Sequence, residues 1–146
     1  MAETVQKVHP KVARTLALWH QMVASQDLTQ LNTIVHPEAV FRSPMANSAY
    51  QSAQALIMVL STVIDVFESF QYHRELATDD GLNVVLEFSA SVGDRQLKGI
   101  DLIRFNEDGQ ITEFEVMVRP ASGLQALGAA MGARLGDKLP DFKAKA

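Results

Sequence analysis

Residues 95–120 read RQLKGIDLIRFNEDGQITEFEVMVRP and decide the fold. The segments 95–105 and 110–120 alternate apolar and polar residues with a period of two, which is typical of half-buried strands. The intervening residues 106–109, NEDG, have the composition of a tight turn. The pattern predicts two antiparallel strands joined by a hairpin, with Asp101 in the middle of the first strand.

Two further strands are expected before this hairpin. Segments 69–76 and 82–92 also alternate with a period of two. The joints TDDG (78–81) and GD (93–94) again have turn chemistry. We therefore expect four consecutive strands that form an antiparallel meander.

Helical segments flank the meander. We expect helices over residues 11–25, 28–35, 53–67 and 121–139, because their apolar residues recur at helical spacing or because helix start and stop signals bound them. Asp27 is the expected N-cap of the second of these helices, and His36-Pro37 its end. A short strand is expected over residues 38–44. Helices followed by an antiparallel meander indicate an α+β fold in which helices pack on one face of a curved sheet.

The turns predict which face of the sheet Asp101 occupies. The two-residue loop 93–94 makes Val92 face Arg95, which places Leu86 opposite Asp101. The four-residue loop 106–109 makes Phe105 face Gln110. Counting along both strands from this pair places Phe114 opposite Asp101, on the next strand. Opposed residues share a face. Asp101 is therefore expected within an apolar wall made of Val84, Leu86, Phe88, Gly99, Ile103, Phe114, Val116 and Val118.

The opposite face of the predicted sheet mixes aliphatic and charged residues. It carries Val85, Glu87, Lys98, Ile100, Leu102, Arg104, Glu115, Met117 and Arg119. Such a face is too apolar for a plain solvated surface and too charged for a core. We expect it to form a homodimer interface, the alternative being an ordinary hydrated sheet face.

Composition narrows the class of protein. The 146 residues fit one domain, 1–146, and 47% of them are hydrophobic. The net charge of −4, without a basic run, argues against nucleic acid as a partner. The absence of cysteine excludes disulfides and thiolate chemistry. No uninterrupted apolar stretch of membrane-spanning length or signal-peptide core is present, so we expect no membrane association and a cytoplasmic location.

The order of elements and the stretch GIDLIRFNEDG (99–109) resemble the nuclear transport factor 2-like superfamily. Its members include ketosteroid isomerases, limonene epoxide hydrolases and polyketide cyclases of the SnoaL type. The resemblance implies a cone-shaped curved antiparallel sheet wrapped around the N-terminal helices, with an apolar cavity and a homodimer through the convex face. In this resemblance, Asp101 corresponds to the aspartic acid that the isomerases keep protonated and use as a hydrogen-bond donor in the oxyanion hole.

Other positions depart from the isomerase pattern. Ser43 stands where that branch has its general-base aspartate, and Trp19 stands near its helix tyrosine. The inward face offers no arginine for the epoxide hydrolase set. The SnoaL-type cyclases resemble the chain better, since one acid in an apolar pocket is thought to suffice. The predicted catalytic residue is Asp101, and the predicted substrate-binding residues are Trp19, Phe41, Ser43, Met58, Leu86, Phe88, Phe114, Val116 and Val118.

Two functions remain open from the sequence. In the first, the protein binds a hydrophobic, oxygen-bearing small molecule, with cyclase, isomerase or lyase-type proton transfer through a neutral Asp101. No metal or cofactor is expected, because the four histidines lack ligand spacing. In the second, it is a non-catalytic dimeric association module with a filled cavity, and Asp101 is a structural acid.

Three glycines, Gly128, Gly132 and Gly136, recur every four residues in the last predicted helix. Each glycine inside a helix costs about 1 kcal/mol relative to alanine, so their spacing requires an explanation. We expect close packing against a neighbouring backbone. The alternative is a loosely held lid at the mouth of a pocket.

Overall fold

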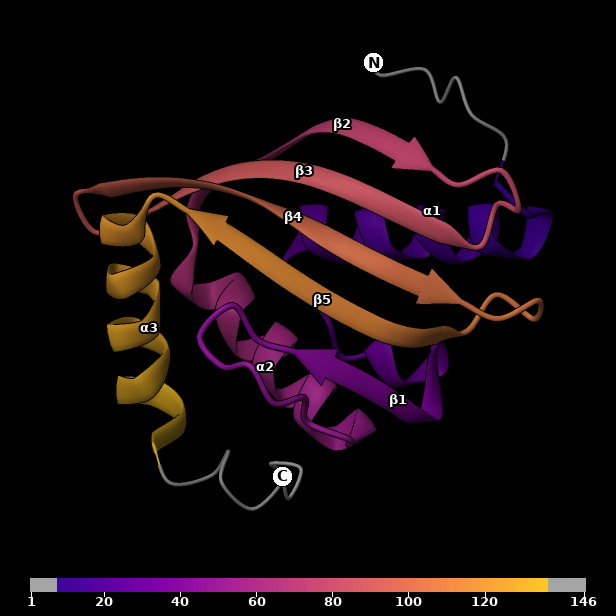
Figure 1. Cartoon of the computed structure of the whole chain (residues 1–146), viewed down its shortest axis with the longest axis horizontal. Coiled ribbons are helices and arrows are strands. Elements are labelled where there is room, and N and C mark those ends of the chain that lie inside the picture. Colours follow the sequence, from indigo (N-terminus) through magenta and orange to yellow (C-terminus); the bar gives the residue numbers. More distant parts are fainter. Residues whose placement is uncertain (1–7, 137–146) are drawn as a thin grey trace.

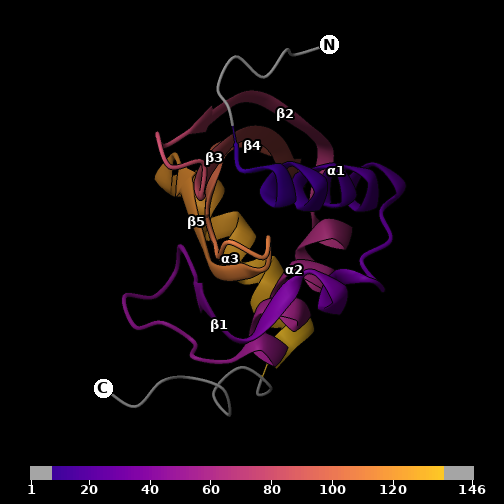
Figure 2. The same ribbon diagram turned by 90° about the vertical axis from the view of Figure 1, so that its right-hand side faces the viewer.

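The computed structural model describes residues 8–136. The chain forms a curved five-stranded sheet with its helices gathered on the concave side (Figures 1 and 2). In chain order the elements are α1 (Pro10–Ser25), η1 (Leu31–Thr33), β1 (Val35–Arg42), α2 (Ala53–Val66), β2 (Glu68–Ala77), β3 (Asn83–Val92), β4 (Arg95–Phe105), β5 (Ile111–Arg119) and α3 (Ala121–Leu135). The predicted helices over 11–25 and 53–67 and the four strands of the meander are confirmed. Residues 137–139 of the last predicted helix lie outside the described range.

The strand order is β1-β5-β4-β3-β2. Strands β2 to β5 form the predicted antiparallel meander, and β1 pairs with β5 in parallel, so the sheet is mixed. In Figure 1, α3 lies at one end of the sheet, and α1 and α2 lie against the concave side. The helices and the sheet therefore enclose the interior from several directions.

The helix predicted over residues 28–35 is wrong. Only Leu31–Thr33 form a 3-10 turn, and β1 already begins at Val35. The Asp27 carboxylate accepts hydrogen bonds from the backbone N–H and the hydroxyl of Thr29, which closes a local turn. A segment this short cannot sustain a helix without tertiary support.

The strand β1 contains Pro37, which was expected to end a helix. A proline lacks the N–H that a central strand needs, but an edge strand tolerates it. Here β1 is the edge of the sheet, and its pairing with β5 is irregular between Val35 and Val40. The irregular stretch contains the proline.

The predicted register is correct between β3 and β4. Val92 pairs with Arg95 and Leu86 pairs with Asp101, and Gly93 in the turn has a φ of 60°. On the other side Asp101 pairs with Val116, so its predicted pairing with Phe114 is wrong by two residues.

Two shifts of one residue each add up beside the turn. Phe105 pairs with Ile111 instead of the predicted Gln110, and Arg104 pairs with Glu113, which leaves Thr112 as an extra residue. A slip of two residues keeps every side chain on its face, whereas a slip of one would reverse it. The face assignment therefore survives. Asp101 lies on the concave side among buried apolar residues, including Leu86, Ile103 and Phe114.

The convex side of the sheet, called the outer face below, carries charge pairs around half-buried aliphatic side chains. Glu87 is bound by the Arg74 guanidinium at 2.7 Å and by the Lys98 ammonium at 3.0 Å. These hydrogen bonds lower the pKa of Glu87, with that from Arg74 the largest cause. Across the sheet, Arg42 binds Glu113 at 2.7 Å. The predicted mixture of aliphatic and paired charged residues is confirmed.

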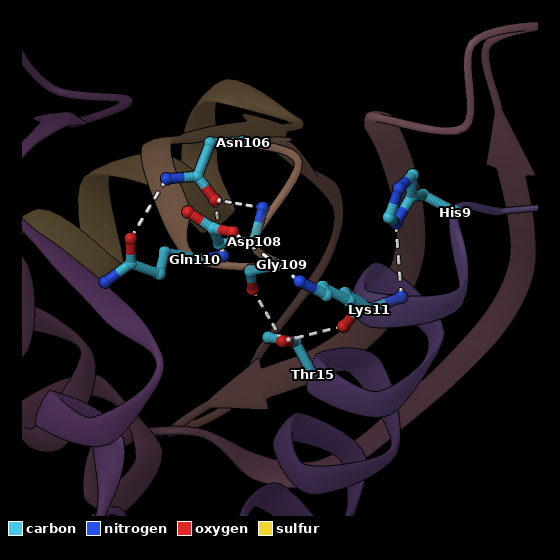
Figure 3. A network of polar contacts seen from close by, with 7 residues as sticks. All are labelled: His9, Lys11, Thr15, Asn106, Asp108, Gly109 and Gln110. Carbon is cyan, nitrogen blue, oxygen red and sulfur yellow. Dashed lines mark hydrogen bonds and ion pairs between the residues drawn. The ribbon is translucent and has the colours of Figure 1, made fainter.

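The N-terminal half of α1 is fixed to the turn between β4 and β5 (Figure 3). The Thr15 hydroxyl donates to the carbonyl of Gly109, and Lys11 forms an ion pair with Asp108 at 3.6 Å. Gly109 has a φ of 81°, and a Cβ at this position would lie 2.5 Å from the Lys11 carbonyl oxygen. Only glycine allows this approach, which positions the whole of α1 over the sheet.

Replacing Gly109 by alanine should destabilise the protein by more than about 2 kcal/mol, because left-handed strain adds to a backbone clash. Gly93→Ala is the matched control, since Gly93 also has a positive φ but no described atom within 4 Å of a built Cβ. It should lose about 1 kcal/mol from strain alone. Urea denaturation measures both values. Equal losses in the two variants would contradict a role for close packing at Gly109.

Candidate functional site

A cavity of about 240 Å³ lies between the concave sheet and the helices. Its walls come from α1, α2, α3, the strands β2, β4 and β5, and the segment at the end of β1. Five of the ten predicted site residues line it, namely Trp19, Phe41, Ser43, Asp101 and Val116. The chain thus brings Asp101 together with part of the predicted apolar wall.

The other five predicted residues lie outside the cavity lining. Leu86, Phe88 and Phe114 are buried in the core, and Met58 and Val118 pack against it. Phe114, for example, is covered by the edge of the Trp19 ring, with centroids 5.4 Å apart. These residues share a face or a helix with the site, but other side chains separate them from the open space.

The Asp101 carboxyl group is nearly enclosed, with 6% of the residue exposed. Its Oδ2 accepts a hydrogen bond of 2.7 Å from the Tyr72 hydroxyl. Burial raises the pKa of Asp101 to about 7, while the Tyr72 hydrogen bond and the charge of His20 act in the opposite direction. Near neutral pH the carboxyl group is therefore divided between its acid and carboxylate forms.

The direction of the hydrogen bonds around Asp101 is fixed by Trp19. The indole Nε1–H donates to the Tyr72 oxygen at 2.9 Å, and an indole can only donate. The Tyr72 hydroxyl accepts this bond and directs its own proton to Asp101. Burial, followed by the nearby Asp101 charge, raises the pKa of Tyr72 well above its usual value, so the phenol keeps its proton.

The second oxygen of the Asp101 carboxyl group, Oδ1, is left for the cavity. Within residues 8–136, every fully enclosed side-chain nitrogen or oxygen has a hydrogen-bond partner. Tyr72 is the hydrogen-bond donor recorded for the Asp101 carboxyl group. Since Asp101 lines the cavity, Oδ1 is the oxygen that can exchange a hydrogen bond or a proton with a molecule inside it.

Tyr72 was missed by the sequence reasoning because of a β-bulge. Glu75 pairs with Leu86, so regular counting would place residue 73 opposite Phe88 and turn Tyr72 outward. The pairing shifts between Tyr72 and Glu75, and Tyr72 itself lies opposite Phe88. A bulge of one residue reverses the facing of the chain beyond it. The alternation Phe70, Tyr72 in an otherwise polar strand was the available sign.

A second polar pair lies behind Tyr72. The His20 Nε2 is 3.1 Å from a Glu75 carboxylate oxygen, and the His20 ring meets Tyr72 edge-on with centroids 5.2 Å apart. The His20 side chain is partly exposed. Within residues 8–136, no group of three or more His, Asp or Glu side chains is placed to hold a metal ion.

Gly128 and Gly132 of α3 and its C-cap residue Gly136 also line the cavity. A Cβ on Gly128 would meet the Met45 side chain, whereas none of the described atoms lies within 4 Å of a Cβ built on Gly132 or Gly136. The expectation of close packing against a neighbouring backbone is therefore wrong at all three, since Gly128 meets a side chain. Among the described residues, none fills the space beside Gly132 and Gly136.

The fold and the cavity define a class of protein. A curved sheet with helices on its concave side, enclosing an apolar cavity, is the α+β architecture of nuclear transport factor 2-like and cystatin-like proteins. Residues 16–114 match the model of the SnoaL-like domain, and the chain belongs to that family. No helix within the described residues has the length and apolar character needed to cross a membrane.

Solved structures agree with this assignment. A steroid delta-isomerase from Pseudomonas aeruginosa is 57% identical, with a TM-score of 0.88 over 92% of this chain and 98% of that one. A protein with a cystatin-like fold from Silicibacter pomeroyi is 31% identical, with a TM-score of 0.78 over 92% of each chain. A nuclear transport factor 2-like protein from Mesorhizobium loti is 15% identical, with a TM-score of 0.69 over 82% of this chain and 100% of that one. None of the curated proteins matches the chain.

The raised pKa of Asp101 has a measurable effect on stability. The folded protein holds the Asp101 proton up to about pH 7, whereas an ordinary aspartate releases it near pH 3.8. Between these values the folded state binds more protons than the unfolded state, so its stability falls as the pH rises. Between about pH 4 and pH 7, the free energy of unfolding of the wild type should fall by on the order of 4 kcal/mol relative to that of Asp101→Asn.

Urea denaturation at pH 4, 5, 6, 7 and 8 tests this expectation. Asp94→Asn is the control, because Asp94 is exposed in the turn between β3 and β4. The free energy of unfolding of Asp94→Asn should change with pH in the same way as that of the wild type. Parallel curves for the wild type and Asp101→Asn would show that Asp101 ionises normally.

Proposed function

We propose that the protein binds an uncharged, hydrophobic small molecule whose oxygen accepts a hydrogen bond from the protonated Asp101 carboxyl group. The observation that carries this proposal is the arrangement of Asp101, with one oxygen held by Tyr72 and the other available to an apolar cavity. A carboxyl group in this setting is a strong donor because water does not compete for it. The open cavity supports ligand binding over an association module with a filled interior.

The lining of the cavity indicates the chemical class of the ligand. Among the described lining residues, Asp101 is the one carboxylic acid, and lysine, arginine and histidine are absent. A phosphate or carboxylate would lack a counter-charge and lose its hydration. The aromatic walls, including Phe67 and Phe70, suit a ring system. A neutral ketone, enone or lactone satisfies both constraints.

The same site supports proton transfer. A general acid–base works best when its pKa lies near the working pH, and that of Asp101 is about 7. Ser43 lines the cavity, and its hydroxyl accepts a hydrogen bond from the Met45 backbone N–H. It cannot act as a second acid, so Asp101 carries the proton alone. Isomerisation or cyclisation without a cofactor is the proposed reaction class, and the similarity to a steroid delta-isomerase supports it.

A bicyclic enone tests the binding proposal directly. The chain has a single tryptophan, Trp19, which lines the cavity and reports a bound ligand by its fluorescence. The affinity should be constant below about pH 7 and should fall towards tenfold per pH unit above it, because the donor proton is lost. Asp101→Leu should abolish binding, and Asp94→Asn should leave it unchanged.

Two results would count against this binding mode. One is equal affinity of the enone for the wild type and Asp101→Leu. The other is stronger binding at pH 6 of a bicyclic amine with the same carbon skeleton, since an amine would select the carboxylate form.

Conversion of a β,γ-unsaturated bicyclic ketone to its conjugated isomer tests the proton transfer. The carboxylate form of Asp101 takes one proton from the carbon between the two groups, and the resulting carboxyl group returns it to the far alkene carbon, so the reaction is balanced without a co-reactant. The wild type should accelerate the rise in conjugated-enone absorbance, and Asp101→Asn should lose at least 100-fold of that rate. Binding of the ketone without any acceleration would leave the protein a binder and reject catalysis.

We further propose that the outer face joins two copies of the chain. Part of its charge is already paired within one chain, as in Arg74–Glu87–Lys98, so these three residues would not be stranded as buried charges in an interface. Met117, 43% exposed, stands among the half-buried Ile100 and Leu102. This surface has the mixed character of a homodimer interface.

Sedimentation equilibrium tests the dimer. The wild type should have twice the 16.0 kDa mass of the chain, and Met117→Glu should reduce it to one chain by placing an unpaired charge in the interface. Leu18→Glu on α1 is the control, because Leu18 is equally exposed but lies away from the outer face. A monomeric wild type would reject this interface.

A further inference from the structure

The glycines of α3 form one row along the cavity, and an apolar row lies beside it. Gly128 and Gly132 are four residues apart on one side of α3, and Gly136 caps its C-terminal end with a φ of 45°. Leu127, Met131 and Leu135 form the neighbouring row and line the cavity as well. A row without side chains next to a row of large ones makes a furrow along the helix.

The furrow lies at the open end of the cavity. Trp19 and Asp101 are 4% and 6% exposed, so the acid occupies the closed end. Met45 is 54% exposed, and Gly132 and Gly136 are also exposed, yet all three line the same cavity. The Met45 side chain lies against Gly128 and forms the opposite wall. A ligand held by Asp101 would therefore extend outward along α3.

Two independent observations make this furrow part of a ligand site. The first is that one continuous cavity reaches from Asp101 to Gly136. The second is that Asp101, more than nine-tenths buried, lines this cavity while Tyr72 holds only its Oδ2. Helix stability would favour alanine at position 132 by about 1 kcal/mol. The space kept free by glycine therefore has a cost, and a ligand offsets it.

We propose that the glycine row of α3 is the floor of a tail subsite that holds an unbranched hydrocarbon chain attached to the oxygen-bearing ring. This inference rests on the proposed function, because the ring is placed by Asp101. The subsite contacts the chain with Met131 and Leu135 on one side and Met45 on the other. It selects ligands by length, since a ring without a chain leaves the furrow empty.

The test compares a bicyclic enone with the same enone carrying a linear hexyl chain opposite the carbonyl, using isothermal titration calorimetry. The wild type should bind the hexyl compound at least tenfold more tightly, since its methylene groups leave water. Gly132→Leu should fill the furrow and remove this gain, so that it binds the two enones with the same affinity. Met45→Trp should act in the same way from the opposite wall.

Ala133→Leu is the matched control, because Ala133 is exposed on the same helix and does not line the cavity. It should retain the full gain from the hexyl chain. Gly132→Ala should melt at a higher temperature than the wild type, which confirms that position 132 tolerates a side chain in the folded protein.

The outcomes separate the two proposals. If the unsubstituted enone still binds through Asp101, two results overturn the tail subsite alone. One is no gain in affinity from the hexyl chain in the wild type, and the other is a full gain in both Gly132→Leu and Met45→Trp. Failure of both enones to bind the wild type overturns the tail subsite together with the proposed function.

Discussion

The hydrogen bond from the Tyr72 hydroxyl to Asp101 is the interaction on which the site depends. It joins β2 to β4, and the indole of Trp19 extends it to α1. Because an indole only donates, the chain of hydrogen bonds has one direction and ends on a single carboxyl oxygen. The remaining oxygen then faces an apolar cavity, where burial keeps its proton near neutral pH. The chemistry of the cavity follows from this geometry.

The position of Asp101 was predictable because local turn chemistry fixes strand register. The two-residue loop at Gly93 gave the pairing with Leu86 correctly. The connection after Phe105 did not, because it is one residue longer than the predicted four-residue turn and Thr112 adds a bulge. The resulting slip of two residues kept Asp101 on the concave face. The helix predicted before β1 failed for a related reason, since a short segment takes its conformation from the edge of the sheet.

The partners of Asp101 were harder to predict. Tyr72 faces inward only because a bulge in β2 reverses the facing of the strand, and no residue pattern specifies that bulge. The cavity lining posed a different problem. Leu86 and Phe114 share the face of Asp101 but lie beneath helices, whereas Met45 and the glycines of α3 come from distant parts of the chain. Tertiary packing determines which inward-facing residues line the cavity, and the periodicity of the sequence does not contain this information.

The site requires that Asp101 keeps its proton up to about pH 7, and the side-chain carboxyl carbon of Asp101 reports its ionisation. A carbon-13 NMR titration of the wild type, with the signal assigned by Asp101→Asn, measures the pKa in the folded protein. We expect a midpoint near pH 7, and a higher midpoint in Tyr72→Phe, because the lost hydrogen bond stabilises the carboxylate. A midpoint near pH 4 in the wild type would mean that Asp101 is an ordinary solvated carboxylate, and the account of the site would be wrong.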